Sequence, residues 1–211
     1  MRFIKLLYLL FCLFFIFSCQ KDKNPISAEN GEIEFPMNIG SNWKYSVTDT
    51  IIHTHPVSME ILYDTVDVKI IDSKVLSNGN KAMIWQYNYR NTIDSIFVSQ
   101  SFDTLYFYND DKYLNIQFGI IFPLELNKKW QLSTSDYKVF IKDTLYTSIG
   151  LFTDVFQLKE YSVRVGNTTG YNEYFIVPQI GIVKYKYEIF TTVSEINHKS
   201  VWQLLFYQIK N

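Results

Sequence analysis

Hydrophobic and polar residues alternate with a period of two along most of the chain after residue 42. The alternation is clearest in Trp43–Ile51, Ala82–Arg90 and Ile182–Phe190, where aromatic or aliphatic side chains occupy every second position. Because successive side chains of a strand point to opposite faces, this period predicts antiparallel strands with one buried and one solvated face. Similar patterns predict further strands near residues 59–75, 93–101, 104–108, 112–118, 137–147, 155–165, 171–177 and 200–210.

Turn-forming residues separate these segments. Asn78-Gly79 and Gly166-Asn167 are typical of tight hairpins, because they tolerate positive φ angles. No segment after residue 18 keeps a period of 3.6 residues over three turns, which argues against long amphipathic helices. Residues 102–108 and 201–209 are apolar on both faces, which a flat sheet with one wet face does not need. The sequence therefore predicts an all-β fold, a single antiparallel meander of about ten or more strands, with little helix. We expect a strongly curved sheet or an open or half barrel.

A short segment of the chain recurs. Phe35–Tyr45 aligns without gaps on Phe122–Leu132, with Phe, Pro and Trp at identical spacing. Proline fixes φ and ends a preceding ladder, and the tryptophan docks the strand that follows. This strand-start motif predicts two halves of the β-domain, residues 35–121 and 122–211. The recurrence is open to two interpretations, a duplicated sheet unit or two coincidental strand starts.

The first 18 residues differ from the rest. Arg2 and Lys5 precede an unbroken apolar run at residues 6–17, which is shorter than the roughly 20 residues of a membrane-spanning helix. The next residues, Ile16-Phe17-Ser18-Cys19, resemble the bacterial lipobox. That resemblance implies a signal peptide at residues 1–18, cleavage before Cys19 and attachment of acyl chains to Cys19. The alternatives are a plain secretory peptide and an uncleaved anchor helix.

A polar segment follows the lipobox. We expect residues 19–34 to form the lipidated N-terminus and a flexible tether, because the segment contains Pro25 and Gly31 and has no apolar period. Two or more acyl chains anchor a protein stably to a membrane. We therefore expect a lipid-anchored protein of the cell envelope, in the outer membrane and facing either the periplasm or the surface.

Composition and charge exclude several classes of protein. A hydrophobic fraction of 47% and an aromatic fraction of 18% exclude a disordered chain. Removal of residues 1–18 leaves 18 basic against 21 acidic residues, a net charge of −3, and no basic stripe. Nucleic acid is therefore not an expected partner. Cys12 and Cys19 are the only cysteines, so the processed chain has no internal disulfide.

Two histidines are the candidate metal ligands. His53 and His55 lie two positions apart, and such residues share a face on a strand, so both imidazoles could reach one ion. His198 or Glu60 would have to supply a third ligand. Pro56 follows directly, so exposed histidines at a strand end or turn are the other interpretation.

Five aromatic residues are the candidate ligand-binding set. Trp85, Tyr87 and Tyr89 share one face of a predicted strand, and Tyr185 and Tyr187 share a face of another. Aromatic faces suit a concave surface for an apolar ligand or a sugar. Ordinary core packing is the alternative.

Recognisable catalytic chemistry is missing from the sequence. It contains no Gly-x-Ser-x-Gly, no phosphate-binding glycine loop and no zinc-protease helix. The Asp-Thr dipeptides at 49–50, 64–65, 103–104 and 143–144 are scattered, and we interpret them as strand-edge or turn residues. We expect no cofactor and no enzymatic activity.

The strand-start motif at residues 35–45 and the late strand Gly181–Tyr185 resemble a group of uncharacterised Bacteroidota-type secreted lipoproteins. The layout is also distantly similar, at the level of fold, to half-barrel lipoproteins that carry lipids. The first resemblance implies an envelope β-domain and brings no known catalytic residues. We expect a membrane-anchored, non-enzymatic binding module for an apolar small molecule or an envelope protein. The alternatives are a structural component of an envelope complex and a hydrolase that uses His53 or His55.

Overall fold

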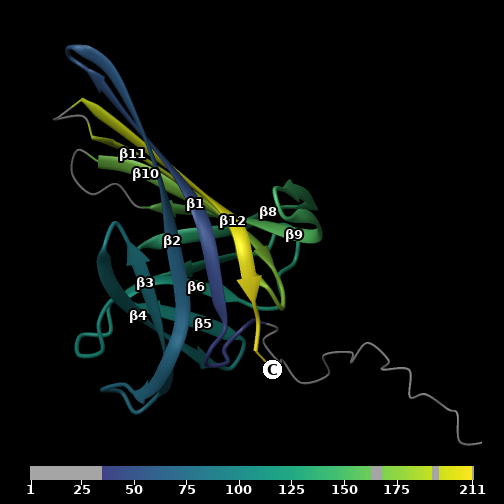
Figure 1. The fold of residues 1–211 in the computed structure, drawn as a ribbon. Coiled ribbons are helices and arrows are strands. Elements are labelled where there is room, and N and C mark those ends of the chain that lie inside the picture. Colours follow the sequence, from purple (N-terminus) through teal and green to yellow (C-terminus); the bar gives the residue numbers. More distant parts are fainter. Residues whose placement is uncertain (1–34, 163–167, 192–194, 211) are drawn as a thin grey trace, which may run out of the picture. The chain divides into compact units, whose positions relative to one another are not determined.

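The computed structural model describes residues 35–162, 168–191 and 195–210. Within these ranges the chain forms twelve strands and no helix (Figure 1). The strands are β1 (Asn42–Thr54), β2 (Val57–Val75), β3 (Lys81–Tyr89), β4 (Thr92–Ser101), β5 (Thr104–Tyr108), β6 (Ile116–Ile121), β7 (Lys129–Leu132), β8 (Ser135–Thr147), β9 (Gly150–Ser162), β10 (Thr168–Val177), β11 (Gly181–Thr191) and β12 (Ile196–Gln208).

All twelve strands belong to one antiparallel sheet with the order β6-β5-β4-β3-β2-β1-β12-β11-β10-β9-β8-β7. Each strand pairs with the next along the chain, except that β6 and β7 are not hydrogen-bonded to each other. The first and last strands close the meander instead, through a ladder that runs from Asn42↔Gln208 to His53↔Ile196. The result is a nearly closed barrel with one unsealed seam, between β6 and β7. The predicted all-β, strongly curved meander is confirmed.

The seam divides the strands into two equal sets. Strands β1–β6 lie within residues 35–121 and strands β7–β12 within residues 122–211. The two copies of the strand-start motif also meet in space, because the rings of Phe35 and Phe122 lie 6.2 Å apart. Duplication as the origin of the recurrence stays a prediction.

Alternation along the strands directs every second side chain into the barrel. In β1, Trp43, Tyr45 and Val47 are buried, and their polar neighbours along the strand are more exposed. Trp43 stacks on Trp85 of β3 with ring centroids 4.8 Å apart. These inward aromatic residues are part of one continuous apolar cluster that draws on both halves of the barrel.

Side chains, rather than a hydrogen-bonded ladder, bring β6 and β7 together at the seam. Gly119 of β6 faces Leu132 of β7, and a Cβ atom at position 119 would overlap the Cδ2 atom of that leucine. The rings of Phe118 and Tyr137 lie 6.0 Å apart beside this contact. Glycine at position 119 therefore allows the two edge strands to approach.

Two strand expectations need correction. Residues 112–115 form a loop rather than the start of a strand, because Asp110 accepts hydrogen bonds from the Lys112 amide at 3.1 Å and the Asn115 side chain at 3.1 Å. Strand β6 consequently begins at Ile116. No predicted strand range covers β7, since its four residues are too few to show a period, although the second copy of the strand-start motif ends on this strand. The turn at Gly79 is confirmed, with a φ angle of 85°.

The predicted signal peptide, the lipidation site at Cys19 and the tether lie outside the described residues, as does the predicted turn at Gly166-Asn167. No helix in the described part of the chain has the length and apolar character that crossing a membrane requires.

Candidate functional site

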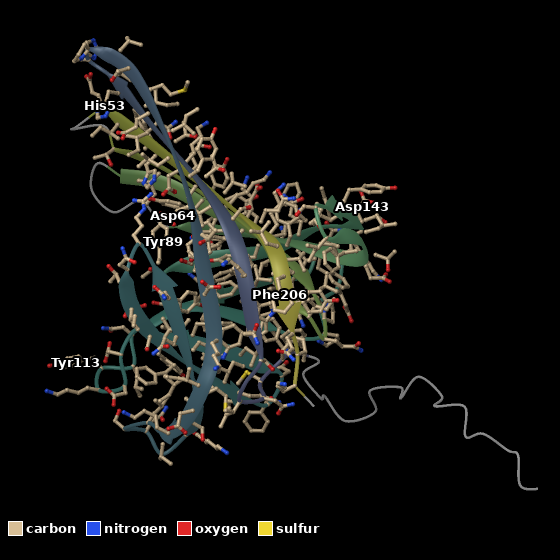
Figure 2. The ribbon with its side chains drawn as sticks, viewed as in Figure 1. His53, Asp64, Tyr89, Tyr113, Asp143 and Phe206 are labelled. Atoms are coloured by element: carbon tan, nitrogen blue, oxygen red, sulfur yellow. The ribbon has the colours of Figure 1, made fainter. Side chains whose placement is uncertain are left out.

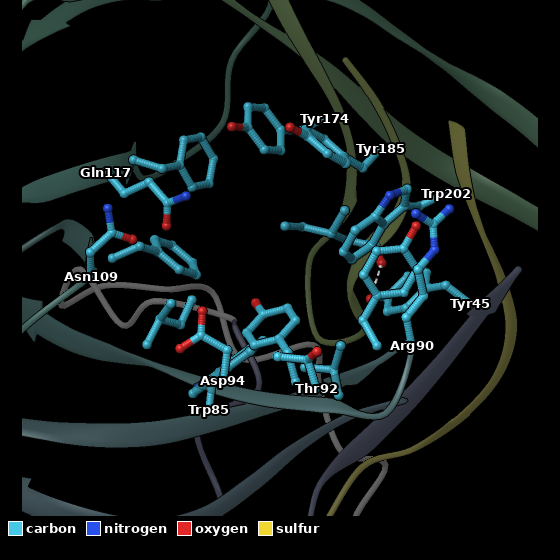
Figure 3. A pocket seen from close by; sticks show the side chains of 17 residues that line it. Tyr45, Trp85, Arg90, Thr92, Asp94, Asn109, Gln117, Tyr174, Tyr185 and Trp202 are labelled. Carbon is cyan, nitrogen blue, oxygen red and sulfur yellow. Dashed lines mark hydrogen bonds between the residues drawn. The ribbon is translucent and has the colours of Figure 1, made fainter. Parts of the chain in front are cut away.

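A cavity of about 630 Å³ lies between the inner faces of strands from both halves (Figure 3). Most of its lining is apolar. The first half of the chain supplies β1 to β6, and the second half supplies β10, β11 and β12. Figure 3 shows Gln117 and Asn109 on the side of the cavity opposite Arg90 and Trp202. The site therefore exists only because the meander closes.

Six aromatic side chains form a continuous series of ring contacts along the cavity wall, which we call the aromatic belt. Neighbouring rings in the series have centroids 6.1, 5.0, 4.0, 5.0 and 5.7 Å apart. Such contacts each contribute about 0.5–1.5 kcal/mol beyond burial of area, so the belt is a preformed surface. Its members, in order, are Trp85 (β3), Phe107 (β5), Phe118 (β6), Tyr174 (β10), Tyr185 (β11) and Trp202 (β12).

Two tyrosines continue the belt back towards β3. The ring of Trp202 lies 6.1 Å from Tyr45 of β1 and 6.2 Å from Tyr89 of β3. Both tyrosines line the cavity. Aromatic faces therefore surround much of the space from one side of the seam to the other.

A buried carboxylate holds two belt tyrosines in place. Glu160 of β9 is only 4% exposed. It accepts hydrogen bonds from the hydroxyls of Tyr137 at 2.9 Å and Tyr174 at 3.1 Å, and from the Asn172 side chain at 2.8 Å. The Tyr185 hydroxyl donates to Asn172 Oδ1 at 3.0 Å, which connects it to the same network. Burial and, secondarily, nearby charge raise the pKa of Tyr174 and of Tyr185 well above the usual value, so both stay neutral phenols at physiological pH.

The polar side chains of the lining, which we call the polar rim, are Arg90, Thr92, Asp94, Asn109 and Gln117. The Arg90 guanidinium donates to Asp49 Oδ2 at 2.8 Å through Nη2. It also donates to Asp64 Oδ2 at 3.3 Å through Nε.

Asp49 is the buried carboxylate of this rim cluster. It is 5% exposed, so the interpretation of this Asp-Thr dipeptide as a strand-edge or turn residue is wrong. Burial disfavours its charge, but hydrogen bonds from Ser200 and Tyr89 and the charge of Arg90 outweigh burial and lower its pKa. In turn, burial and the hydrogen bond to Asp49 raise the pKa of Tyr89 to about 12. Figure 2 shows Asp64 and Tyr89 in the same region of the sheet.

Comparison with known proteins adds little to this geometry. No family model matches the chain, and no curated protein sequence matches it. Among solved structures, a DUF1329 family protein from Desulfovibrio piger is similar with a TM-score of 0.26 and 6% sequence identity. The match covers 82% of this chain and 88% of the other. A similarity this low carries no conclusion about ligand or activity.

Four of the five predicted aromatic residues line the cavity, namely Trp85, Tyr87, Tyr89 and Tyr185. Tyr187 does not, and its hydroxyl lies 2.8 Å from His198 Nδ1 instead. The alternating pattern correctly places Tyr187 on the same face of β11 as Tyr185. It carries no information about how far along the barrel each side chain lies.

Sequence reasoning missed the lining residues that come from distant strands. Phe118, Tyr174 and Trp202 lie on strands that the sequence predicted in part, but no local pattern shows that their rings meet. The available signal was the two-sided apolar character of residues 102–108 and 201–209, which include Phe107 and Trp202.

The structure does not gather the predicted metal ligands into a site. His53 lies near the end of β1, opposite Ser58 and Ile196, and Figure 2 shows it near the upper end of the ribbon, away from Tyr113 and Phe206. His55 lies in the turn after β1, and its Nδ1 contacts the carboxylate of Glu195. Among the described residues, no group of three or more His, Cys, Asp or Glu is arranged to hold a metal ion. The metal site stays a prediction.

Proposed function

We propose that this chain is a non-enzymatic binding protein that holds an apolar ligand in the barrel cavity. We further propose that acyl chains on Cys19 tether it to the outer membrane of a bacterial envelope. The observation that carries the proposal is the cavity of about 630 Å³ with its aromatic belt. Sites for small molecules typically measure about 300–1,000 Å³ and are lined by apolar and aromatic side chains with a few polar groups.

The lining favours binding over acyl or phosphoryl transfer. The 17 lining residues in the described part of the chain include no serine, cysteine, histidine or lysine. Nucleophilic catalysis needs a nucleophile beside a base, and this lining contains neither a Ser–His pair nor a Cys–His pair. The side chains of the polar rim can orient a ligand.

A matched pair of variants on β4 tests the proposal. Ile96 lines the cavity, whereas Ile93, three residues earlier, does not line it and is 65% exposed. Ile96→Trp adds volume inside the cavity and should weaken binding of a neutral fluorescent naphthylamine probe by about tenfold or more. Ile93→Trp should leave the affinity unchanged. Equal affinities in both variants and the parent, with melting temperatures unaltered, would exclude the cavity as the binding site.

The outer face of β2 favours a second candidate function, docking of an envelope protein. Four large apolar side chains on alternate positions of this strand are 86%, 64%, 42% and 77% exposed. Contiguous exposed apolar side chains mark interaction surfaces. These side chains are Val57, Met59, Ile61 and Tyr63.

Site-directed cross-linking in cells tests this second function. A photo-reactive residue at position 59 should give one covalent adduct of defined mass. The control position is Tyr113, which is 70% exposed and lies in the loop between β5 and β6. A similar range of adducts from both positions would reject a specific partner on β2.

A further inference from the structure

Carboxylates outnumber cations around the cavity. Among the described residues that line the cavity, Arg90 is the one basic residue. Its guanidinium is already paired with Asp49 at 2.8 Å and Asp64 at 3.3 Å. Asp94 also lines the cavity and has no ion-pair partner among the described residues. The polar rim and the two carboxylates paired with Arg90 therefore carry more negative than positive charge.

Glu160 adds a buried carboxylate that contacts the belt through the hydroxyl of Tyr174. All three of its hydrogen-bond donors are neutral, and in the part of the chain that the structure describes no cation lies within ion-pair distance of it. Ionised carboxylates accept several hydrogen bonds in this manner. Buried charges are screened less by salt than exposed ones, so a carboxylate here acts over a longer range than a surface residue.

The belt itself complements a positive charge. The faces of tyrosine and tryptophan rings attract ammonium and guanidinium groups, by about 0.5–1 kcal/mol when exposed and about 2 kcal/mol when desolvated. Tyr174 is stacked between Phe118 and Tyr185, with ring centroids 4.0 and 5.0 Å away, so its own faces are covered. The ring faces offered to a cation are therefore those of other aromatic residues in the lining, such as Trp202 and Tyr89.

We infer that the preferred ligand carries a protonated amine or a quaternary ammonium group on an apolar body, and that anionic amphiphiles are disfavoured. This inference rests on the proposed function, because it names the ligand class of the same cavity. The apolar body would occupy the space between the belt residues. The cation would lie against ring faces within reach of Asp94 or of the field of Glu160.

A titration with three single-chain amphiphiles tests the inference on the purified full chain, held in solution by a non-ionic amphipathic polymer. Octyltrimethylammonium, octyl glucoside and octyl sulfate share one tail and differ in head-group charge, and each is used below its micelle concentration. Tryptophan fluorescence reports binding, because Trp85 and Trp202 line the cavity. We expect the ammonium probe to bind about tenfold more tightly than the sulfate, with the glucoside between them.

The possible outcomes separate the two proposals. Equal affinities for all three probes, or tighter binding of the sulfate, would overturn the cationic preference and leave the binding function intact. No binding of any probe would overturn the proposed function itself.

Charge-neutralising variants locate the origin of the preference. Glu160→Gln should reduce the ammonium-to-sulfate ratio, and the glucoside affinity measured alongside shows how much of any change comes from movement of the tyrosines that Glu160 holds. Glu173→Gln is the matched control, since Glu173 pairs with Lys159 at 3.6 Å and Lys186 at 3.7 Å and does not line the cavity. Asp94→Asn is a second test on an exposed rim residue, which should fold even if Glu160→Gln does not. A ratio that stays at the parent value in every variant that folds would refute the electrostatic argument.

Vesicles distinguish a lipid source of the cation from a soluble one. The protein is incubated with phosphatidylcholine or phosphatidylglycerol vesicles of identical acyl chains, and the lipid it retains is measured after vesicle removal. Retention of phosphatidylcholine above phosphatidylglycerol supports a lipid head group as the cation. Retention of neither, together with a preference for the ammonium probe, supports a soluble amine. Retention of more phosphatidylglycerol contradicts the inference.

Discussion

The contact between Gly119 and Leu132 allows a sharp test of how the barrel closes. Gly119 has an ordinary φ angle, so alanine at this position meets no backbone strain. Gly→Ala changes at such sites stabilise proteins by about 0.4–1 kcal/mol, because the unfolded chain loses conformational freedom. Here, however, the new Cβ would overlap Leu132 Cδ2 and lie 3.2 Å from the Leu105 carbonyl oxygen.

The steric cost of the new methyl group should exceed the stabilisation that comes from the lower entropy of the unfolded chain. Forcing an additional methyl group into a packed contact costs about 1–3 kcal/mol. We therefore expect Gly119→Ala to destabilise the protein, and a domain of this size loses about 2–4 °C of melting temperature per kcal/mol. Urea denaturation, followed by circular dichroism at the β-sheet band, gives the free energy of unfolding directly.

A second background changes the effect that we expect of Gly119→Ala on the free energy of unfolding. Leu132→Ala removes the atom that the new methyl group would overlap. In that background Gly119→Ala should be neutral or slightly stabilising. The two changes would thus be non-additive, as expected for residues in contact. Equal destabilisation by Gly119→Ala in both backgrounds would show that the side-chain contact across the seam is not what limits position 119.

Two further predictions concern charge and anchoring. The pKa of Asp49 is lowered in the folded protein, so its ionised form stabilises the fold above the unfolded pKa of about 3.9, and this stability is lost as the pH falls through the lowered value. Asp49→Asn should therefore be less stable than the parent at pH 7, and this difference should shrink as the pH falls below the unfolded pKa. The exposed Asp67→Asn should differ little from the parent at any pH. Parallel stability curves for Asp49→Asn and the parent would contradict this. Cys19→Ser should abolish labelling by a radioactive or clickable fatty acid and move the protein out of the Triton-extracted membrane fraction. Unchanged labelling and membrane retention would remove the lipoprotein proposal.

Local alternation predicted most of the strands because strand geometry depends on neighbouring residues. Side chains two positions apart share a face, so the burial of Trp43, Tyr45 and Val47 follows from the pattern around them. The pattern is weaker where a strand is short or a loop has its own hydrogen bonds. For this reason β7 was missed and the start of β6 was placed four residues too early.

The cavity could not be predicted from local patterns, because it is formed by contacts between residues far apart in the sequence. Tyr185 and Tyr187 share a face of β11, yet only Tyr185 lines the cavity, because alternation specifies the face and not the height along the barrel. The sequence pattern placed Asp49 at a strand edge or turn, whereas the fold surrounds it with Tyr89 and Arg90.

The all-β character and the alternation of buried and exposed faces follow from the order of residues, since those properties arise from residues a few positions apart. The pairing of β1 with β12, the seam between β6 and β7 and the stacking of Phe118 on Tyr174 appear only in the folded chain. These features depend on how twelve strands curve and register as one sheet, and the ring-lined space between them follows from that closure.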